Sequence, residues 1–432
     1  MLKGFFLMDL GKNIRNYRTA LGITQEELAK PNLNRSVISQ IESGKIDPSL
    51  KTLKQIATSL GVKISDLIEE VEDIEVSQVI LLNRSKNFIV KKKYLKAKET
   101  LELVSFTDLT PEHKGMYHKI YGILFYSMKN HEAAIQELVK ALEYITPTNI
   151  NDYIEVYSYL VFSYRYTGKF MESINGSVYG VFLLEKFNLS DHNILLYIKF
   201  TYNLAVCYCR INQFEDGLLM IEKVNKVSAE YDLYLYGGSL DMLEGIAHLY
   251  LGNYRKSIAV STNALNHFEA KQDYANIVAC LTNLAICYRK IDNFDKSIEY
   301  LQEAIKICNE HELNDYKNNA TFEMALNLFN KQNFRMLLDY VEKDINKEDD
   351  FIQAKLKYIL AKVYLEKKEF SKAIQELELA ISFFKEKNPY WLSECYLLKG
   401  TILVDQGNLL NAITYFEDGH KILLKKTGEF LF

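Results

Sequence analysis

From about residue 90 onward the sequence repeats with a period near 40 residues, and this repeat constrains the fold more than any other feature. An anchor residue, usually aromatic, is followed three places later by a small or apolar residue, and in most units a second small residue precedes the anchor by nine places. Small residues at these places let two helices pack closely, so each unit is predicted to be a helical hairpin. Anchor spacings of 36 to 44 residues give about nine units. The anchors are Tyr94, His131, Phe170, Phe214, Tyr254, Phe294, Phe334, Phe370 and Leu409.

The composition favours an all-α protein and excludes several functional classes. Only five of the 432 residues are proline, and 48% are hydrophobic. No apolar run approaches the roughly 20 residues of a membrane span, and Met1–Leu7 is too short for a secretory leader. The six cysteines include no C-x-x-C pair, so we expect buried free thiols and a cytoplasmic location. Metalloprotease, hydrolase and nucleotide-binding motifs are absent from the sequence, so we expect no enzyme, no cofactor and no metal.

The N-terminal stretch Leu21–Pro48 has the start and stop signals of two short helices. Thr24 and Glu27 form a T-x-x-E capping box, and Lys30-Pro31-Asn32 ends the helix that the box begins. Asn34 can cap the second helix and Gly44 can stop it, while Ile38 and Ile41 lie on its core side. The outer side or first turn of that helix then holds Arg35, Ser36, Val37, Ser39 and Gln40.

Charge is distributed unevenly along the chain. Residues 9–65 hold nine basic and five acidic side chains, a net charge of +4, whereas the whole chain carries −4. A modest positive charge has the right sign for binding the phosphates of DNA. Attraction to DNA is therefore expected at the N-terminal end alone.

The N-terminal stretch resembles the Xre/Cro-like helix-turn-helix domains of phage repressors, through T-Q-E-E-L-A, I-S-Q-I-E-S-G and the following Pro48. The resemblance implies a phosphate contact for Gln25 and base contacts for Arg35, Ser36, Ser39 and Gln40, with Val37 on the same face. It also implies an ion pair between Arg18 and Glu42. The turn between Ala29 and Ile38 is one residue shorter than in many members, which shifts these assignments by about one position. A helix-turn-helix that serves only dimerisation is the alternative.

The repeats resemble tetratricopeptide repeats, as in NLAVCYCRINQFEDGLLMIEKV and NLAICYRKIDNFDKSIEYLQEAIKI. The resemblance implies a right-handed superhelix with a concave groove that binds peptides. Asn203 and Asn283 share the place eleven before their anchors, where an amide can bind a peptide backbone. Arg165 and Arg289 share the place five before theirs, where a guanidinium can bind a carboxylate. The alternative is that the asparagines bond neighbouring helices and the arginines are solvated.

The whole layout resembles the RRNPP group of peptide-pheromone receptors of Gram-positive bacteria, most like its NprR and PlcR types. We accordingly expect a helix-turn-helix domain at 8–70, a helical linker at 71–90 and a tetratricopeptide domain at 91–432. The resemblance implies a cytoplasmic quorum-sensing regulator, a homodimer on a palindromic operator in double-stranded DNA, controlled by a short signalling peptide and without a membrane partner. The alternative is a regulator that binds and sequesters a response regulator of a phosphorelay and needs no DNA.

Overall fold

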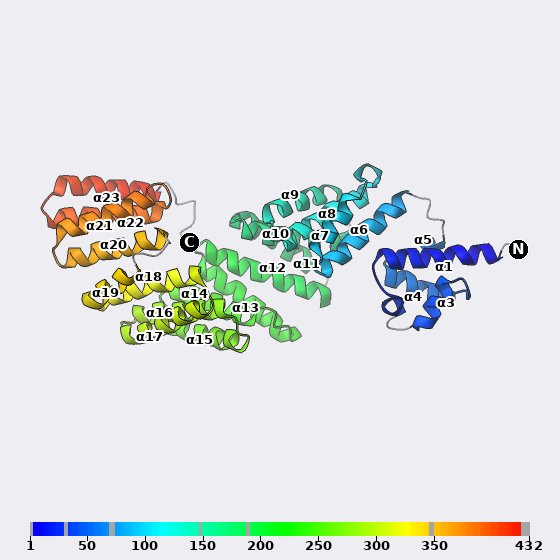
Figure 1. Cartoon of the computed structure of the whole chain (residues 1–432), viewed down its shortest axis with the longest axis horizontal. Helices are drawn as coiled ribbons and strands as arrows, with labels where there is room; N and C mark the ends of the chain where they lie inside the picture. Colours follow the sequence, from blue (N-terminus) through cyan, green and yellow to red (C-terminus); the bar gives the residue numbers. More distant parts are fainter. Residues whose placement is uncertain are drawn as a thin grey trace. The chain divides into compact units, whose positions relative to one another are not determined.

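The computed structural model describes residues 3–29, 33–68, 74–146, 149–186, 191–344 and 350–424. Over these ranges the chain is built from helices joined by short turns, and no strand occurs in them (Figure 1). The chain divides into two compact units, residues 1–204 and 205–432, which are described separately. Within the described ranges we find no helix with the length and hydropathy that crossing a membrane requires. The expected all-α fold is confirmed.

The first five helices of the first unit enclose a small hydrophobic core. Ile14, Ile38, Ile56 and Leu67 are fully buried in it, one from each of four helices. The side chain of Ser49 accepts a hydrogen bond from the Thr52 amide at the start of the fourth helix. Such caps bind amides that lack a partner within the helix. The helices are α1 (Lys3–Ala20), α2 (Gln25–Ala29), α3 (Arg35–Glu42), α4 (Leu50–Leu60) and α5 (Ile64–Ile68).

Gly11 allows α1 to lie directly against the end of α3. A Cβ atom at this position would lie 2.3 Å from the carbonyl oxygen of Ile41, closer than any side chain tolerates. The first helix can therefore approach the candidate DNA-reading helix only through glycine.

The remainder of the first unit consists of helices that pack in antiparallel pairs. The pairs α8 with α9 and α10 with α11 form hairpins, and a 3₁₀ turn precedes α8. The last helix of the series crosses the boundary between the two units. The elements are α6 (Ile74–Val90), α7 (Tyr94–Glu102), η1 (Phe106–Asp108), α8 (Pro111–Ser127), α9 (His131–Tyr144), α10 (Ile150–Tyr166), α11 (Phe170–Lys186) and α12 (Asp191–Arg210).

The helix α6 falls in the segment predicted to be a linker. It is helical as expected, but it packs against α7 as the first helix of a hairpin, with Leu82 and Ile89 buried in that hairpin's core. On another side, Ile80 packs against the core of the first five helices, and the side chain of Asn87 donates a hydrogen bond to the carbonyl oxygen of Leu21. The same helix therefore contacts both parts, and the limits 8–70 and 91–432 stay a prediction.

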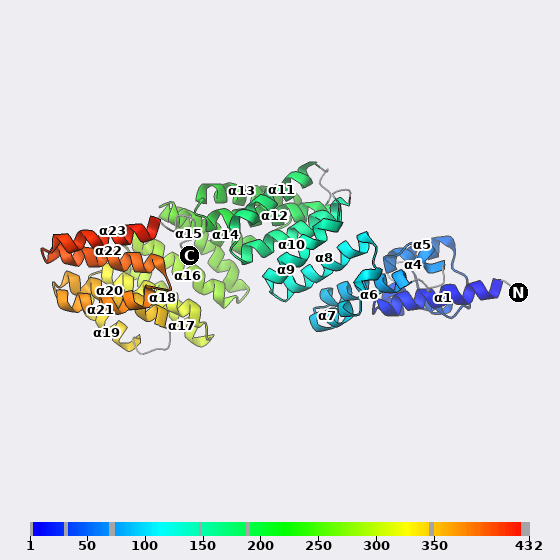
Figure 2. The ribbon, with the colours of Figure 1, turned by 90° about the horizontal axis from the view of Figure 1, so that it is seen from above.

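The second unit continues the series of hairpins through residue 424 (Figures 1 and 2). Its largest core joins side chains from α15 to α20, including Leu284, Leu328 and Leu356, all fully buried. The helices are α13 (Phe214–Tyr231), α14 (Gly237–Tyr250), α15 (Tyr254–Ala270), α16 (Tyr274–Lys290), α17 (Phe294–Glu310), α18 (Asn314–Asn330), α19 (Phe334–Asp344), α20 (Asp350–Glu366), α21 (Phe370–Phe384), α22 (Pro389–Asp405) and α23 (Leu409–Leu424).

Each predicted anchor is the first residue of the second helix of a hairpin, from Tyr94 at the start of α7 to Leu409 at the start of α23. The two small-residue places that flank the anchor meet across the hairpin. In three hairpins the residue three places after the anchor is a serine whose hydroxyl donates to the backbone carbonyl nine places before the anchor. This bond is 2.7 Å long in all three, namely Ser173 to Val161, Ser257 to Gly245 and Ser297 to Ala285.

The turn inside each hairpin depends on a residue in the left-handed region, two places before the anchor. At all nine anchors this residue has a φ between 56° and 79°. Three of these residues are glycine, and the other six carry a side chain that is strained in this conformation, as Lys129 is at φ 62°. The left-handed backbone reverses the chain within three residues, which brings the two helices together.

We predict opposite effects on stability at two of these turns. Gly252→Ala, at φ 77° with open space around it, should lower the free energy of unfolding by about 1 kcal/mol. Lys129→Gly should raise it by about 0.5 kcal/mol, because glycine relieves the backbone strain but makes the unfolded chain more flexible. Urea unfolding followed by circular dichroism measures the free energy of unfolding of both variants. Two changes of the same sign would contradict the left-handed backbone at these turns.

Candidate nucleic-acid interface and candidate peptide-binding residues

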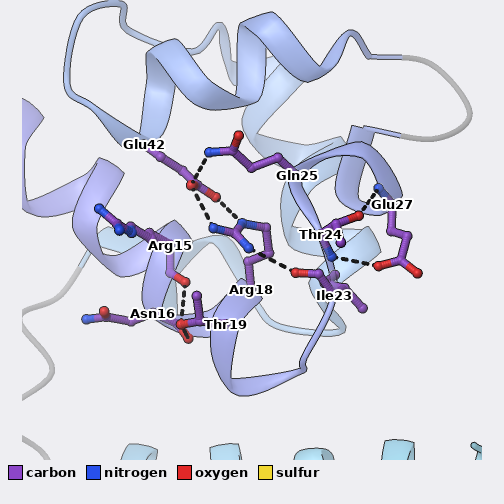
Figure 3. Close-up of polar contacts among 9 residues, drawn as sticks. All are labelled: Arg15, Asn16, Arg18, Thr19, Ile23, Thr24, Gln25, Glu27 and Glu42. Carbon is purple, nitrogen blue, oxygen red and sulfur yellow. Dashed lines mark hydrogen bonds and ion pairs between the residues drawn. The ribbon is translucent and has the colours of Figure 1, made fainter.

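The two helices of the helix-turn-helix begin where the sequence predicts. The Glu27 amide donates to the Thr24 hydroxyl at 3.1 Å, and the Thr24 amide donates to the Glu27 carboxylate at 2.6 Å, which completes the capping box (Figure 3). The side chain of Asn34 accepts from the Ser36 amide at 3.2 Å, and Gly44 follows α3 in the left-handed conformation. The predicted stop at Lys30-Pro31-Asn32 lies outside the described residues.

The helix α3 has one buried face and one exposed face. Ile38 and Ile41 are buried in the core, and Val37 is half-buried against it. The exposed residues of α3 include the other four candidates for base contacts: Arg35, Ser36, Ser39 and Gln40. These four side chains are therefore available to a groove of DNA, whereas Val37 can offer only part of its surface.

The carboxylate of Glu42, at the end of α3, accepts hydrogen bonds from side chains of α1 and α2. Glu42 accepts from Arg18 Nε at 2.5 Å and from Arg18 Nη2 at 3.0 Å, so the guanidinium binds it with two donors. Arg18 Nη1 donates to the Ile23 carbonyl at 2.9 Å (Figure 3). The Glu42 side chain is 3% exposed and that of Arg18 12%. Bidentate pairs of this kind are strong and fix geometry, so Arg18 from α1 orients α3.

Gln25 joins this network through its amide nitrogen, which donates to Glu42 at 2.8 Å (Figure 3). An amide nitrogen carries two protons, and Gln25 is half-exposed at the start of α2. The second proton can therefore still be donated to a phosphate, with the amide held in place by the carboxylate. The contact between Gln25 and Glu42 was not anticipated from the sequence, because it depends on how α2 and α3 cross.

Asn203 occupies the structural role that the sequence left open as an alternative. Its side chain is fully buried, and its amide nitrogen donates to the hydroxyls of Ser173 at 2.7 Å and Ser177 at 2.9 Å. In later hairpins Cys287 and Asn327 contact the corresponding serine, also at a separation of 30 residues. In this structure Asn203 therefore bonds neighbouring helices and is inaccessible to a peptide.

The register of α12 explains why Asn203 is buried there. Cys287 and Asn327 precede their anchors by seven residues, whereas Asn203 precedes Phe214 by eleven. The anchors on either side of Asn203, Phe170 and Phe214, are 44 residues apart, whereas the anchors on either side of Cys287 and of Asn327 are 40 residues apart. The four additional residues equal about one helical turn. In α12, Asn203 therefore occupies the place that a residue seven before the anchor occupies in the later hairpins, one turn closer to the anchor. Asn283, its counterpart by sequence, is half-buried in α16.

Arg289 and Arg165 share a sequence position but differ in their surroundings. Arg289 is 8% exposed, and its Nη2 donates to the Glu323 carboxylate at 2.7 Å, 34 residues further on. That internal ion pair occupies Arg289. The residue 34 places after Arg165 is Lys199, which is exposed and offers no carboxylate.

Arg165 instead lies among aromatic rings. Its guanidinium carbon is 4.7 Å from the ring centre of Phe162 and 4.9 Å from that of Tyr166. Its Nη1 is buried and has no acceptor among the described residues. The pKa of His131 is lowered, first by burial and then by the positive charge of Arg165, so that imidazole does not add a charge at neutral pH. The Arg165 residue is partly exposed, so its guanidinium can pair with a carboxylate from outside the chain.

Comparison with known proteins identifies both parts of the chain. Residues 14–67 match the family model for a helix-turn-helix, and residues 239–310 and 354–386 match models for the tetratricopeptide repeat. A helix-turn-helix-type transcriptional regulator of Methanocaldococcus jannaschii is 47% identical over 55 residues, which are 12% of this chain and 83% of that protein. The immunity repressor protein of Bacillus phage phi105 is 28% identical over 139 residues, 32% of this chain and 85% of the repressor.

The chain belongs to the helix-turn-helix transcriptional regulators, through its N-terminal residues, and carries a tetratricopeptide-repeat domain behind them. Among solved structures it is similar to a Rap protein in complex with Competence and Sporulation Factor. That likeness has a TM-score of 0.52 at 14% identity and covers 82% of this chain and 99% of the other. At this identity the likeness concerns the fold.

We predict that Glu42→Ala destabilises the N-terminal helices by about 3 kcal/mol, because it leaves the largely buried Arg18 guanidinium without its carboxylate. Glu26→Ala, an exposed site on α2, is the matched control and should change stability by less than about 0.5 kcal/mol. Hydrogen exchange of the α1 and α3 amides in the full chain reports the difference. Equal protection in the two variants would show that the network contributes little.

Proposed function

We propose that this protein is a cytoplasmic quorum-sensing transcription regulator of the RRNPP type. In this proposal a homodimer binds a palindromic operator through α2 and α3, and a short signalling peptide bound by the hairpins controls that binding. Membership of the helix-turn-helix regulators and the tetratricopeptide domain behind it support the combination. The fold is also similar to that of a Rap protein in complex with Competence and Sporulation Factor.

The exposed face of α3 supports the DNA-binding half of the proposal. Arg35 and Gln40 can form two hydrogen bonds each with base edges, which is how proteins distinguish guanine and adenine in the major groove. Two such helices read one face of B-DNA when they are about 34 Å apart, which a symmetric dimer provides. The hydrogen bond to Glu42 orients the Gln25 amide, which supports its proposed contact with a phosphate beside that face.

Arg165 is the observation that carries the peptide-binding half. The Arg165 residue is partly exposed, so a short peptide with a free C-terminus or an acidic side chain can pair with its guanidinium. Its buried Nη1 has no acceptor among the described residues. The aromatic rings of Phe162 and Tyr166 hold the guanidinium in a fixed direction. The counterpart Arg289 is already paired with Glu323, so Arg165 is the better candidate of the two.

Helix α6 provides a physical connection between the peptide and DNA sites. It contributes Ile80 to the edge of the helix-turn-helix core and binds Leu21 through Asn87, while its other face is buried in the first hairpin. A peptide that favours one arrangement of the hairpins therefore also biases the position of α2 and α3. The bias equals the difference in its affinity for the two arrangements, and a few kcal/mol suffices to switch the population.

We predict that Arg35→Ala combined with Gln40→Ala weakens binding to the operator at least about 30-fold, since each base pair read by two hydrogen bonds contributes about 1 to 3 kcal/mol. The operator is obtained by selection from random DNA with the wild-type protein, and a gel shift measures the affinity. Arg255→Ala combined with Gln302→Ala, exposed on α15 and α17, is the control and should bind normally. Unchanged affinity in the first variant would overturn the assignment of the reading face.

We predict that Arg165→Gln weakens a peptide selected from a random pentapeptide library about tenfold or more, because a charge-assisted hydrogen bond contributes about 1.5 to 3 kcal/mol. Calorimetry measures the affinity, and Arg210→Gln, exposed at the end of α12, is the control. If Arg165→Gln binds as tightly as the control, Arg165 is not a peptide contact.

A further inference from the structure

A recess beside α8 and α9 arises from the shortness of α7. That helix has nine residues, whereas α9 has 14 and α11 has 17. After α7 the chain passes through η1, and Thr110 then caps α8. Figure 2 shows α7 as a short helix next to α6 and α8. A longer helix in this place would cover the side of α8, which instead stays partly open.

Aromatic rings line the open side of α8. Tyr117, Tyr121 and Phe125 are one turn apart and half-buried, and their ring centres are 4.9 Å and 5.8 Å apart in order. Phe106 of η1 extends the row, 5.3 Å from Tyr117. With Tyr144 of α9 they form a recess of about 670 Å³. This volume is within the range of ligand-binding cavities, about 300 to 1,000 Å³.

Acidic groups from α9 accompany the rings. Glu137 and Glu143 line the recess together with His118 and Lys140. Glu137 accepts from His118 Nδ1 at 2.7 Å and from Lys140 Nζ at 2.8 Å. Burial opposes its charge, but these two bonds lower the pKa of the Glu137 carboxyl overall, so it is ionised at neutral pH. Glu143 is exposed at the recess and carries a second negative charge.

Two tyrosines of the recess are neutral. Burial raises the pKa of the Tyr117 and Tyr121 hydroxyls, and the charges of Glu102 and Glu137 act in the same direction, while Lys140 lowers the pKa of Tyr117. The phenols therefore stay neutral and add ring faces without charge. Lys114 Nζ already lies 5.3 Å from the ring centre of Phe106, which shows that a cation can lie on this row of rings.

We propose that this recess binds an arginine side chain within a polypeptide segment of a partner protein. A planar guanidinium stacks on aromatic faces, is weakly hydrated and pairs with a carboxylate such as Glu143 in two bonds. The cavity of about 670 Å³ exceeds the size of one side chain, so residues next to the arginine fill the rest. None of its lining residues belongs to the reading face of α3 or to the candidate peptide contacts, so the inference is independent of the proposed function.

The test compares two tripeptides that differ only in charge. Acetyl-phenylalanyl-arginyl-phenylalaninamide should bind the full chain at least about threefold more tightly than the same peptide with neutral citrulline in place of arginine. Acetylargininamide alone should bind at least about threefold more weakly than the arginine tripeptide, because it fills less of the recess. Saturation-transfer NMR, observing the ligands, measures all three affinities.

Variants of the chain locate the site. Glu143→Gln should remove most of the preference for arginine over citrulline, whereas Glu222→Gln, also an exposed site, on α13, should keep it. Equal binding of the two tripeptides, absence of binding, or identical behaviour of the two variants would overturn the proposal. Equal binding of acetylargininamide and the tripeptide would overturn its polypeptide part.

Discussion

The contact between the two helices of a hairpin is the constraint on which the rest of this structure depends. A left-handed residue two places before each anchor reverses the chain, and a small residue on each helix then lets the backbones approach. Where that residue is serine, as at Ser257, its hydroxyl binds a backbone carbonyl that already serves the helix. Neighbouring hairpins pack their apolar faces together, as in the core that α15 to α20 share.

Small departures from this repeat create the features that matter for function. Four additional residues between Asn203 and Phe214 make Asn203 the spatial counterpart of Asn327, which also contacts a buried serine. At the spacing that separates Arg289 from Glu323, the residue after Arg165 is a lysine. With no carboxylate at position 199, the buried Nη1 of Arg165 has no acceptor among the described residues. In the same way, the short helix α7 leaves a row of rings on α8 uncovered. Both proposed binding sites lie where the repeat is irregular.

Local signals in the sequence predict much of the fold. The capping box of Thr24 and Glu27, the cap at Asn34 and the anchors all appear where expected, because each depends on residues within a few places of one another. The pairing of Arg18 with Glu42 followed from the family resemblance. The left-handed turn residues were missed because only three of the nine are glycine, although glycine or asparagine at a fixed place before the anchor is a readable signal.

Contacts between repeats could not be predicted in the same way. Asn203 was assigned to a groove by counting back from the next anchor, but four additional residues between Asn203 and Phe214 change that count. Counted from the preceding anchor, Asn203 corresponds to Asn327, which bonds a neighbouring helix. Arg289 and Arg165 share a position relative to their anchors, but the partner of Arg289, Glu323, lies 34 residues further along the chain and outside the repeat pattern. The prediction for α6 named only a connecting helix. In the structure this helix contributes side chains to the core of the first five helices and to the core of the first hairpin.

The central claim is that a peptide carboxylate at Arg165 controls DNA binding at α3. The most direct test is the affinity of the full chain for its selected operator, measured by fluorescence anisotropy with and without a saturating library-selected peptide, and again with the same peptide amidated at its C-terminus and any acidic side chain neutralised. We predict that the unmodified peptide changes the operator affinity about tenfold or more, corresponding to at least about 1.4 kcal/mol of coupling, and that the neutral peptide does not. An operator affinity unaffected by either peptide would contradict the claim.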